Sequence, residues 1–315
     1  GVIAAAGIGK FEDYPDADFT KVNKQALRSE IARARSLTRG VIGVNLMVAS
    51  ADYDDMVQTA VEENIDVIIS GAGLPLELPR FIGGKDIGLI PIVSSARTLK
   101  IICKRWLSRY NRLPDAVIVE GPRAGGHLGY GYDDLVNGTV PDLKDILTEV
   151  LDTVSSFDGA FPVVAAGGIF GGGDIAKYIS FGATGVQMAT RFVCTNECDA
   201  SPKYKDLYLS CAPEDIVVIN SPVGMPGRVI RNEFVKKIST GERIDFDCAY
   251  QCLVTCDPRK VNYCIAKALI NAYRGDLDKG FAMCGSNAYR IKKIVPVKEL
   301  IAELSGDARR YLREG

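Results

Sequence analysis

The sequence lacks the features that mark several large classes of protein. Its 315 residues include a single histidine, His127, and carry a formal net charge of -1. No run approaches 18 uninterrupted apolar residues, so we expect no transmembrane helix. A near-neutral chain also lacks the basic field that a nucleic-acid-binding surface needs. No secretory signal is present in the sequence, which starts without Met.

The nine cysteines form no obvious disulfide framework, which favours a reducing cytoplasm. Cys248, Cys252 and Cys256 recur every fourth residue, and Cys264 follows. On a helix, that spacing would place three thiolates on one face as metal or iron–sulfur ligands. The tight Cys-x-x-Cys pairs of common clusters are absent, and Pro258 would end such a helix. We therefore favour unligated cysteines that pack as small hydrophobes, and predict no metal.

Short, apolar, β-branched runs alternate with longer segments of helical character. Continuous apolar strands separated by helices indicate a parallel sheet covered on both faces. The predicted strands are 1–6, 40–47, 65–71, 87–94, 115–121, 161–168 and 184–192, and the predicted helices are 19–37, 53–63, 97–110, 142–155 and 173–181.

Polar and glycine residues gather where successive strands end, among them Asn45, Glu120-Gly121 and Gly167-Gly168. This distribution is typical of the active face of an α/β barrel, whereas a doubly wound sheet concentrates such residues at one switch point. We predict an α/β fold of the TIM-type (β/α)8 barrel class. Seven strand–helix units are visible, and we expect the first barrel strand to be absent from the chain.

After about residue 195 the strand–helix rhythm breaks. We predict that residues 1–195 and 285–315 form the barrel, and that 196–284 form a smaller, mostly helical inserted domain. Within the insert, "DIVVINSPVGMPGRVI" reads as a strand or hairpin. Arg228 or Arg231 at its end would hold an anionic ligand or form a salt-bridged connection between the domains.

Two neighbouring strand ends predict a phosphate site. Gly167 and Gly168 would let main-chain amides approach a ligand, and the helix that begins near Asp174 favours an anion. Gln187 to Thr190 end the next strand, where barrels commonly bind phosphate. The Gly-x-x-x-x-Gly-Lys-Ser/Thr motif of nucleoside triphosphatases is absent.

His127 lies in "IVEGPRAGGHLGYG", after the fifth predicted strand. The surrounding glycines would let a flat cofactor ring approach. An imidazole with an ordinary pKa of about 6.5 suits general acid–base chemistry. We predict that His127 is the catalytic residue; the competing interpretation is a solvated turn residue.

Six ordered motifs carry a family resemblance: "GVNLM", "IPIVSS", "EGPRAGGHLG", "PVVAAGGI", "GATGVQMATRF" and "PGRVIRNEF". Together they resemble the nitronate monooxygenase (2-nitropropane dioxygenase) family, which includes the related FMN-dependent enoyl-acyl carrier protein reductases. The resemblance implies an FMN-binding barrel with a helical second domain. It also implies that "GVIAAAGIG" is the second barrel strand, since relatives begin with a strand that ends in a Gln-Gly-Gly-Met-like turn.

The resemblance assigns roles to individual positions. His127 corresponds to the base that removes an α-proton from a nitroalkane, or to the acid-side group in reduction. Glu120 stands where a flavin-contacting Gln is common, Arg123 where Glu or Gln is frequent, and Ala189 where Gly is frequent. The implied cofactor-binding residues are Asn45, Glu120, Gly125, Gly167, Gly168, Gln187, Met188, Ala189 and Thr190.

The expected activity is the FMN-dependent oxidation of alkyl nitronates or nitroalkanes with O2. The alternative is an NAD(P)H-dependent enoyl-acyl carrier protein or quinone reductase that uses FMN. A flavin-binding protein without turnover is the non-enzymatic alternative. The expected partner is a small molecule, either a nitronate or an enoyl thioester, without nucleic acid or membrane; a homodimer is left open.

Overall fold

The computed structural model describes residues 1–9, 18–248 and 250–314. The chain divides into two compact units. The first comprises the described residues within Gly1–Ile118, Thr153–Pro162 and Asp247–Cys256, and the second those within Val119–Asp152, Val163–Phe246 and Asp257–Gly315. The two units divide the chain at positions other than residue 195. The predicted domain boundary near residue 195 therefore stays a prediction.

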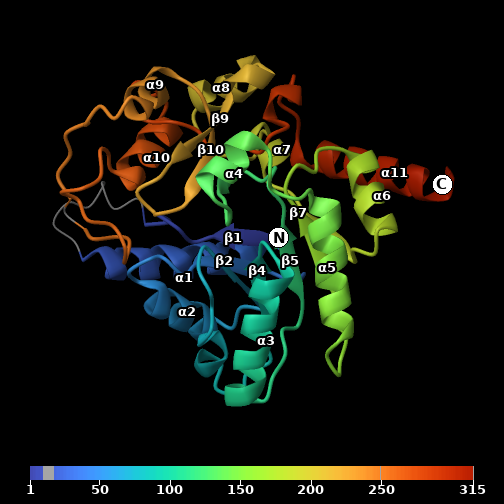
Figure 1. Ribbon diagram of the computed structural model, residues 1–315. Coiled ribbons are helices and arrows are strands. Elements are labelled where there is room, and N and C mark those ends of the chain that lie inside the picture. Colours follow the sequence, from blue (N-terminus) through green and yellow to red (C-terminus); the bar gives the residue numbers. More distant parts are fainter. Residues whose placement is uncertain (10–17, 249, 315) are drawn as a thin grey trace. The chain divides into compact units, whose positions relative to one another are not determined.

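The first unit is a parallel sheet with helices (Figure 1). Its strands pair in chain order, and Asn45, for example, lies opposite Ala4 on one side and Ile69 on the other. The strands are continuously apolar because they are buried. The elements are β1 (Val2–Ala4), α1 (Phe19–Leu37), β2 (Gly43–Met47), α2 (Tyr53–Glu62), β3 (Val67–Gly71), the 3-10 helix η2 (Leu78–Phe81), β4 (Gly88–Val93), α3 (Ala96–Tyr110) and the start of β5 (Val117–Glu120).

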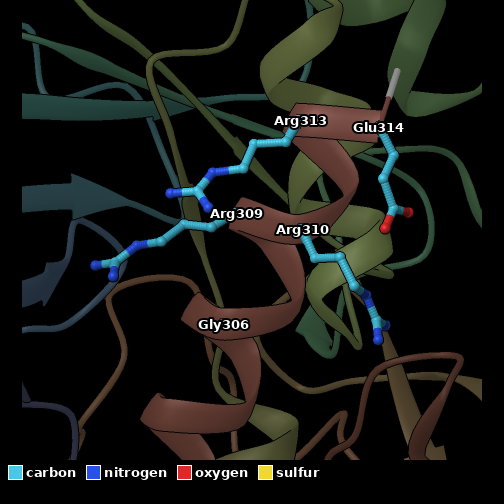
Figure 2. A pocket seen from close by; sticks show the side chains of 5 residues that line it. All are labelled: Gly306, Arg309, Arg310, Arg313 and Glu314. Carbon is cyan, nitrogen blue, oxygen red and sulfur yellow. The ribbon is translucent and has the colours of Figure 1, made fainter.

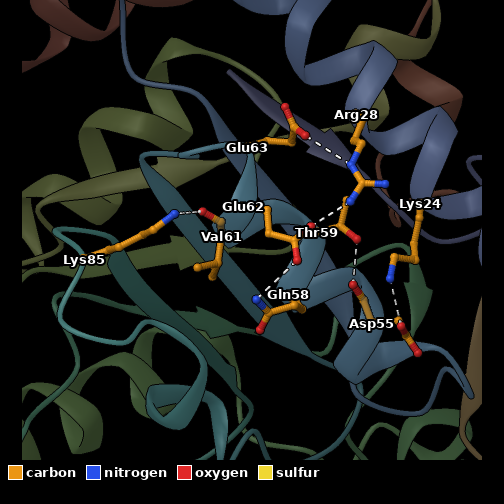
Figure 3. A network of polar contacts seen from close by, with 9 residues as sticks. All are labelled: Lys24, Arg28, Asp55, Gln58, Thr59, Val61, Glu62, Glu63 and Lys85. Carbon is orange, nitrogen blue, oxygen red and sulfur yellow. Dashed lines mark hydrogen bonds and ion pairs between the residues drawn. The ribbon is translucent and has the colours of Figure 1, made fainter.

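Helices α1 and α2 are joined by the ion pairs of Figure 3. Arg28 lies 2.7 Å from Glu62 and 3.2 Å from Glu63, and Lys24 lies 3.1 Å from Asp55. These side chains are partly exposed, so each pair stabilises the fold by about 0–1 kcal/mol. The pairs therefore orient two helices whose buried apolar faces, with residues such as Leu27, hold them in place.

None of the described residues in the cysteine-rich segment lies in a helix, which argues against the alternative of three thiolates on one helical face. Cys248 is exposed, so the favoured packing as a small hydrophobe is wrong for this residue. Leu253 forms an antiparallel bridge with Ser50. The Ala51 N–H donates to the Cys252 oxygen, and the Val254 N–H donates to the Ala49 oxygen, both at 3.0 Å. Around this single bridge the described residues form turns, so the fourfold spacing does not correspond to one face of a helix.

Cys264 sits elsewhere, as the N-cap of α10 (Ile265–Arg274). In the part of the chain that the structure describes, no group of three or more His, Cys, Asp or Glu residues is arranged to hold a metal ion. Over the same residues, no helix combines the length and apolarity needed to cross a membrane.

The second unit holds parallel strands, a small antiparallel sheet of order β6-β10-β9, and several helices. The predicted hairpin in residues 215–230 is confirmed as β9 and β10. The further elements are β6 (Gly126–His127), α4 (Tyr132–Asn137), α5 (Leu143–Ser155), β7 (Val163–Ala166), α6 (Gly172–Ser180), β8 (Gly185–Gln187), α7 (Thr190–Val193), α8 (Pro202–Ser210), η3 (Pro213–Asp215), β9 (Ile216–Asn220), β10 (Pro226–Ile230), α9 (Glu233–Ser239), η4 (Ala288–Arg290) and α11 (Val297–Glu314).

The parallel strands follow the chain in both units, β1-β2-β3-β4-β5 in the first and β5-β7-β8 in the second, with β5 divided between them. Sequential parallel strands alternating with helices are those of the predicted TIM-type barrel. The last predicted strand, 184–192, is too long. Strand β8 ends at Gln187, and α7 begins at Thr190.

Helices α6 and α11 pack closely at Gly172. A Cβ atom at Gly172 would lie 2.3 Å from the Asp307 Cβ and 2.5 Å from the Ala308 nitrogen. Both distances are well inside van der Waals contact, so only glycine allows this approach. At the neighbouring Gly171, no atom lies within 4 Å of the corresponding position.

We therefore expect Gly172→Ala to lower the free energy of unfolding by about 1–3 kcal/mol, because overpacking forces the two helices apart. Gly171→Ala is the matched control and should change stability much less. Urea denaturation of both variants measures the difference. Equal stability losses would show that this contact does not limit the packing of α11.

Candidate active site

The loop that follows β5 is held by Arg228. This side chain is buried, and its Nη1 donates to the main-chain oxygens of Pro122 at 2.7 Å and Ala124 at 2.5 Å. Burial lowers the pKa of the guanidinium. Arg231 instead donates to the main-chain oxygen of Glu214 and pairs with Asp215 at 3.4 Å. Both arginines thus have protein partners, which favours the structural interpretation of this segment over an anion site.

Gly125 lies against the main chain of the segment 283–285. A Cβ at Gly125 would stand 2.5 Å from the carbonyl carbon of Cys284 and 2.6 Å from the Gly285 nitrogen. The Cys284 N–H donates to the Arg228 oxygen at 3.1 Å, which fixes this segment beside β10. Close packing of two main chains therefore accounts for the glycine at 125, and its predicted contact with a cofactor remains a prediction.

His127 lies in β6, a strand of two residues that the sequence did not predict. It pairs with Gly227 of β10, and the Leu128 N–H donates to the Pro226 oxygen at 2.8 Å. The His127 Nε2 lies 2.8 Å from the Ser221 Oγ, in the turn between β9 and β10. Burial lowers the pKa of His127 to about 4, so the imidazole is neutral at neutral pH.

Glu120 ends β5, and burial raises the pKa of its carboxyl group to about 7. The Tyr130 hydroxyl donates to the main-chain oxygen of Glu120 at 2.5 Å. Burial raises the pKa of Tyr130 above its ordinary value, and the Glu120 charge adds to the rise. The second unit thus contains a neutral base and a carboxyl group that changes protonation near pH 7.

The turn after β7 contains two glycines with left-handed backbone, Gly167 at φ +96° and Gly168 at φ +78°. A Cβ at Gly168 would meet the Arg123 side chain at 2.8 Å. The start of the next helix, where the sequence predicts an anion site, is capped by Asp174. The Asp174 Oδ2 already accepts the N–H groups of Phe170 and Gly171, so the chain itself supplies the anion there.

A loop that sequence reasoning missed joins the two turns. The Gly285 N–H donates to the Thr190 Oγ1 at 3.0 Å, and the Asn287 Nδ2 donates to the Gly168 oxygen at 2.6 Å. Ser286, between them, carries a buried hydroxyl without a hydrogen-bond partner among the described residues. The structure therefore brings Gly168 and Thr190 together through residues 285–287.

The remaining predicted residues differ in their surroundings. Gln187 ends β8, Ala189 is the exposed N-cap of α7, and the Met188 side chain packs against a buried cluster that includes Leu300. Asn45 lies within β2 of the first unit, two residues before the strand ends. All the other predicted site residues belong to the second unit.

Ser221 and residues 285–287 carried no signal in the sequence. Ser221 is one of many serines, and only the hairpin that presents it could be anticipated. The pocket of Figure 2, lined by Gly306, Arg309, Arg310, Arg313 and Glu314, is formed by α11 alone. It contains none of the predicted site residues, so it is not the candidate active site.

Comparisons with known proteins agree with this fold. The chain is 27% identical to FabK from Thermotoga maritima, with a TM-score of 0.76 over 99% of this chain and 93% of that one. It is 25% identical to a probable nitronate monooxygenase of Staphylococcus aureus (strain Newman), over 80% of this chain and 78% of the relative.

A third relative is "(3aS,4S,5R,7aS)-5-hydroxy-7a-methyl-1-oxo-octahydro-1H-indene-4-carboxyl-CoA dehydrogenase" of Mycobacterium tuberculosis (strain ATCC 25618 / H37Rv). It is 30% identical over 69% of this chain and 56% of its own length. A dehydrogenase of the same name is matched over 54% of its own length. The chain thus spans about half the length of these two curated relatives.

The family model for nitronate monooxygenase matches residues 22–307. This match includes the loop with His127, both glycine turns and the hairpin that holds Ser221. The chain belongs to the nitronate monooxygenase family.

Proposed function

We propose that this protein is an FMN-dependent oxidoreductase that oxidises alkyl nitronates or nitroalkanes with O2. The observation that carries the proposal is the protonation state and the position of the His127 imidazole. It is the only histidine in the chain, it is neutral, and its Nε2 is held 2.8 Å from the Ser221 Oγ. Family membership supports the choice of nitronates as the substrate class.

The residues present fit the phosphate end of FMN. The main-chain N–H groups of Gly168 and Thr190 have no hydrogen-bond partner within the described part of the chain. The Thr190 hydroxyl accepts from Gly285, which leaves its own hydrogen free to donate. Gly168 and residues 187–190 would hold the phosphate, with Gly167 shaping the turn. Glu120 and Gly125 would contact the remainder of the cofactor, as the family resemblance implies.

Bound FMN would supply the redox chemistry, accepting electrons from the substrate and passing them to O2. The chain supplies the acid–base chemistry. A neutral imidazole has a lone pair ready to take the α-proton of a nitroalkane, and it needs no prior deprotonation at neutral pH. Preformed nitronates lack this proton, so their oxidation would not depend on the base.

The alternative is that the same site acts on a carbon next to a thioester, as an NAD(P)H-dependent enoyl reductase with FMN. The 30% identity to a CoA dehydrogenase favours this second candidate. Nitroalkanes and acyl thioesters share an acidic C–H beside an electron-withdrawing group, so one base serves both. We further propose a cytoplasmic protein with a small-molecule substrate, since the spacing of the nine cysteines in the sequence shows no obvious disulfide framework.

The two candidates differ in their electron donors, which an anaerobic visible spectrum separates. If the protein is a nitronate monooxygenase, the bound-flavin band should bleach with an alkyl nitronate and ignore NADH and NADPH. Bleaching by either nucleotide would favour the reductase, with enoyl thioesters and quinones as the next substrates. Purified full-length protein that never shows a flavin band would contradict both.

We expect His127→Asn to lower kcat/KM for a neutral nitroalkane by about 10²–10⁴-fold, the usual contribution of a general base. Turnover of the preformed nitronate and the flavin spectrum should remain, because the amide replaces the base without charge. Steady-state oxygen consumption with both substrates measures the ratio. Unchanged nitroalkane turnover would remove His127 from the mechanism.

The pH profile should reflect two partly buried groups. Folding lowers the pKa of His127 to about 4, so kcat/KM for the nitroalkane should fall on the acid side near pH 4 rather than 6.5. Folding raises the pKa of Glu120 to about 7, so Glu120 favours the folded state in acid and loses this contribution as pH rises through about 7.

Glu120→Gln separates the two groups. Any transition near pH 7, in activity or in stability, should disappear in this variant, while the acid limb near pH 4 stays. An acid limb near pH 6.5 that survives in Glu120→Gln would mean that His127 titrates as a solvated imidazole.

A further inference from the structure

Ser221 is positioned by its own turn to meet His127. It follows β9 directly, and the Val223 N–H donates to the Ser221 Oγ at 3.3 Å. The same oxygen lies 2.8 Å from the His127 Nε2. The other ring nitrogen, Nδ1, has no hydrogen-bond partner among the residues that the structure describes.

Tyr263 lies behind Ser221. Its side chain is 1% exposed, and burial raises the pKa of the phenol, while a hydrogen bond with Ser221 opposes the rise. The Tyr263 hydroxyl donates to the Asn220 oxygen at 3.3 Å. The ring packs edge-on against Phe234 and Phe281, with centroids 5.9 Å apart in each pair. A rigid aromatic cluster therefore fixes the hydroxyl next to Ser221.

The hydrogen-bond donors and acceptors that link His127, Ser221, Tyr263 and Asn220 fit together in one consistent order. A serine hydroxyl has one hydrogen and two lone pairs, and a tyrosine hydroxyl has one hydrogen. The Tyr263 hydrogen goes to the Asn220 oxygen, which leaves the lone pairs of the Tyr263 oxygen open to the hydrogen of Ser221. Val223 fills one lone pair of Ser221, which leaves the second lone pair for a hydrogen on His127 Nε2.

We propose that Ser221 and Tyr263 are positioning residues that hold His127 as the tautomer with its proton on Nε2, which leaves Nδ1 as the basic nitrogen. The resulting order of donation is His127 to Ser221 to Tyr263 to the Asn220 carbonyl. Donation from Ser221 to the His127 Nε2 would instead leave the Tyr263 oxygen without a donor and place a proton on Nδ1, which has no acceptor among the described residues.

The chemical consequence rests on the proposed function. The Nδ1 lone pair takes the α-proton, the C–H bond breaks, and its electron pair stays on the substrate as the nitronate. His127 then carries a positive charge, and its Nε2–H donates to an oxygen already polarised by Tyr263. Hydrogen bonds to a charged group are stronger than neutral ones, so the hydrogen bonds from His127 through Ser221 to Tyr263 stabilise the product of proton transfer.

Nitrogen-15 NMR of the single histidine tests the tautomer in the flavin-loaded protein, with an affinity tag that contains no histidine. Wild-type protein at pH 7 should show one neutral tautomer, protonated at Nε2. Ser221→Ala should give a mixture of tautomers, and Ser221→Thr, which keeps a hydroxyl, should restore the single one. A proton on Nδ1 in the wild type, or unchanged tautomers in Ser221→Ala, would overturn the proposal.

Kinetics supply the second test. Ser221→Ala and Tyr263→Phe should each lower kcat/KM for the nitroalkane by up to about tenfold, the net contribution of one hydrogen bond. Turnover of the preformed nitronate should stay within about twofold. Tyr53→Phe is the matched control, because Tyr53 is a half-buried tyrosine of the first unit whose hydroxyl lies 2.8 Å from the Ser70 Oγ. Equal losses on nitroalkane and nitronate would overturn the positioning role.

The two proposals can fail separately. If His127→Asn keeps full nitroalkane turnover, the base assignment fails, while NMR still decides the tautomer. If His127→Asn loses turnover but Ser221→Ala and Tyr263→Phe do not, only the positioning role fails.

Discussion

The pairing of β6 with β10 is the contact on which the candidate site depends. Only Gly126 and His127 pair with Gly227 and Arg228, yet this register brings the imidazole to the turn that carries Ser221. The same strand β10 supplies Arg228, whose guanidinium holds the preceding loop by two carbonyl oxygens. A short antiparallel ladder thus sets both the position of the base and the shape of the loop around it.

Burial shifts the pKa values of the ionisable groups around the candidate site. His127 and Glu120 come from one short stretch of chain, and burial disfavours the charged form of each. Arg228 remains charged because main-chain oxygens solvate it. The region therefore combines neutral acid–base groups with a fixed cation, an arrangement suited to moving a proton without a large change in net charge.

The fold was predictable where local pattern decides structure. Helix α1 occupies its predicted range, 19–37, and the continuous apolar runs became parallel strands because burial on both faces demands them. Strand β6 was not predictable, since two residues carry no periodicity and the partner strand lies about a hundred residues later. The cysteine spacing misled for a similar reason, because a long-range bridge between Leu253 and Ser50 fixes that segment in a non-helical conformation.

The types of residue at the site could be predicted from the sequence, but the contacts between those residues could not. His127 was chosen for its chemistry, but Ser221 could be found only from the distance between two side chains that are 94 residues apart. That separation has a consequence for synthesis on the ribosome. His127 leaves the exit tunnel long before the hairpin that pairs with it, and until then the imidazole is hydrated, with an ordinary pKa. The base acquires its chemical character only late in translation, so a chain released early would carry the histidine without the environment that shapes it.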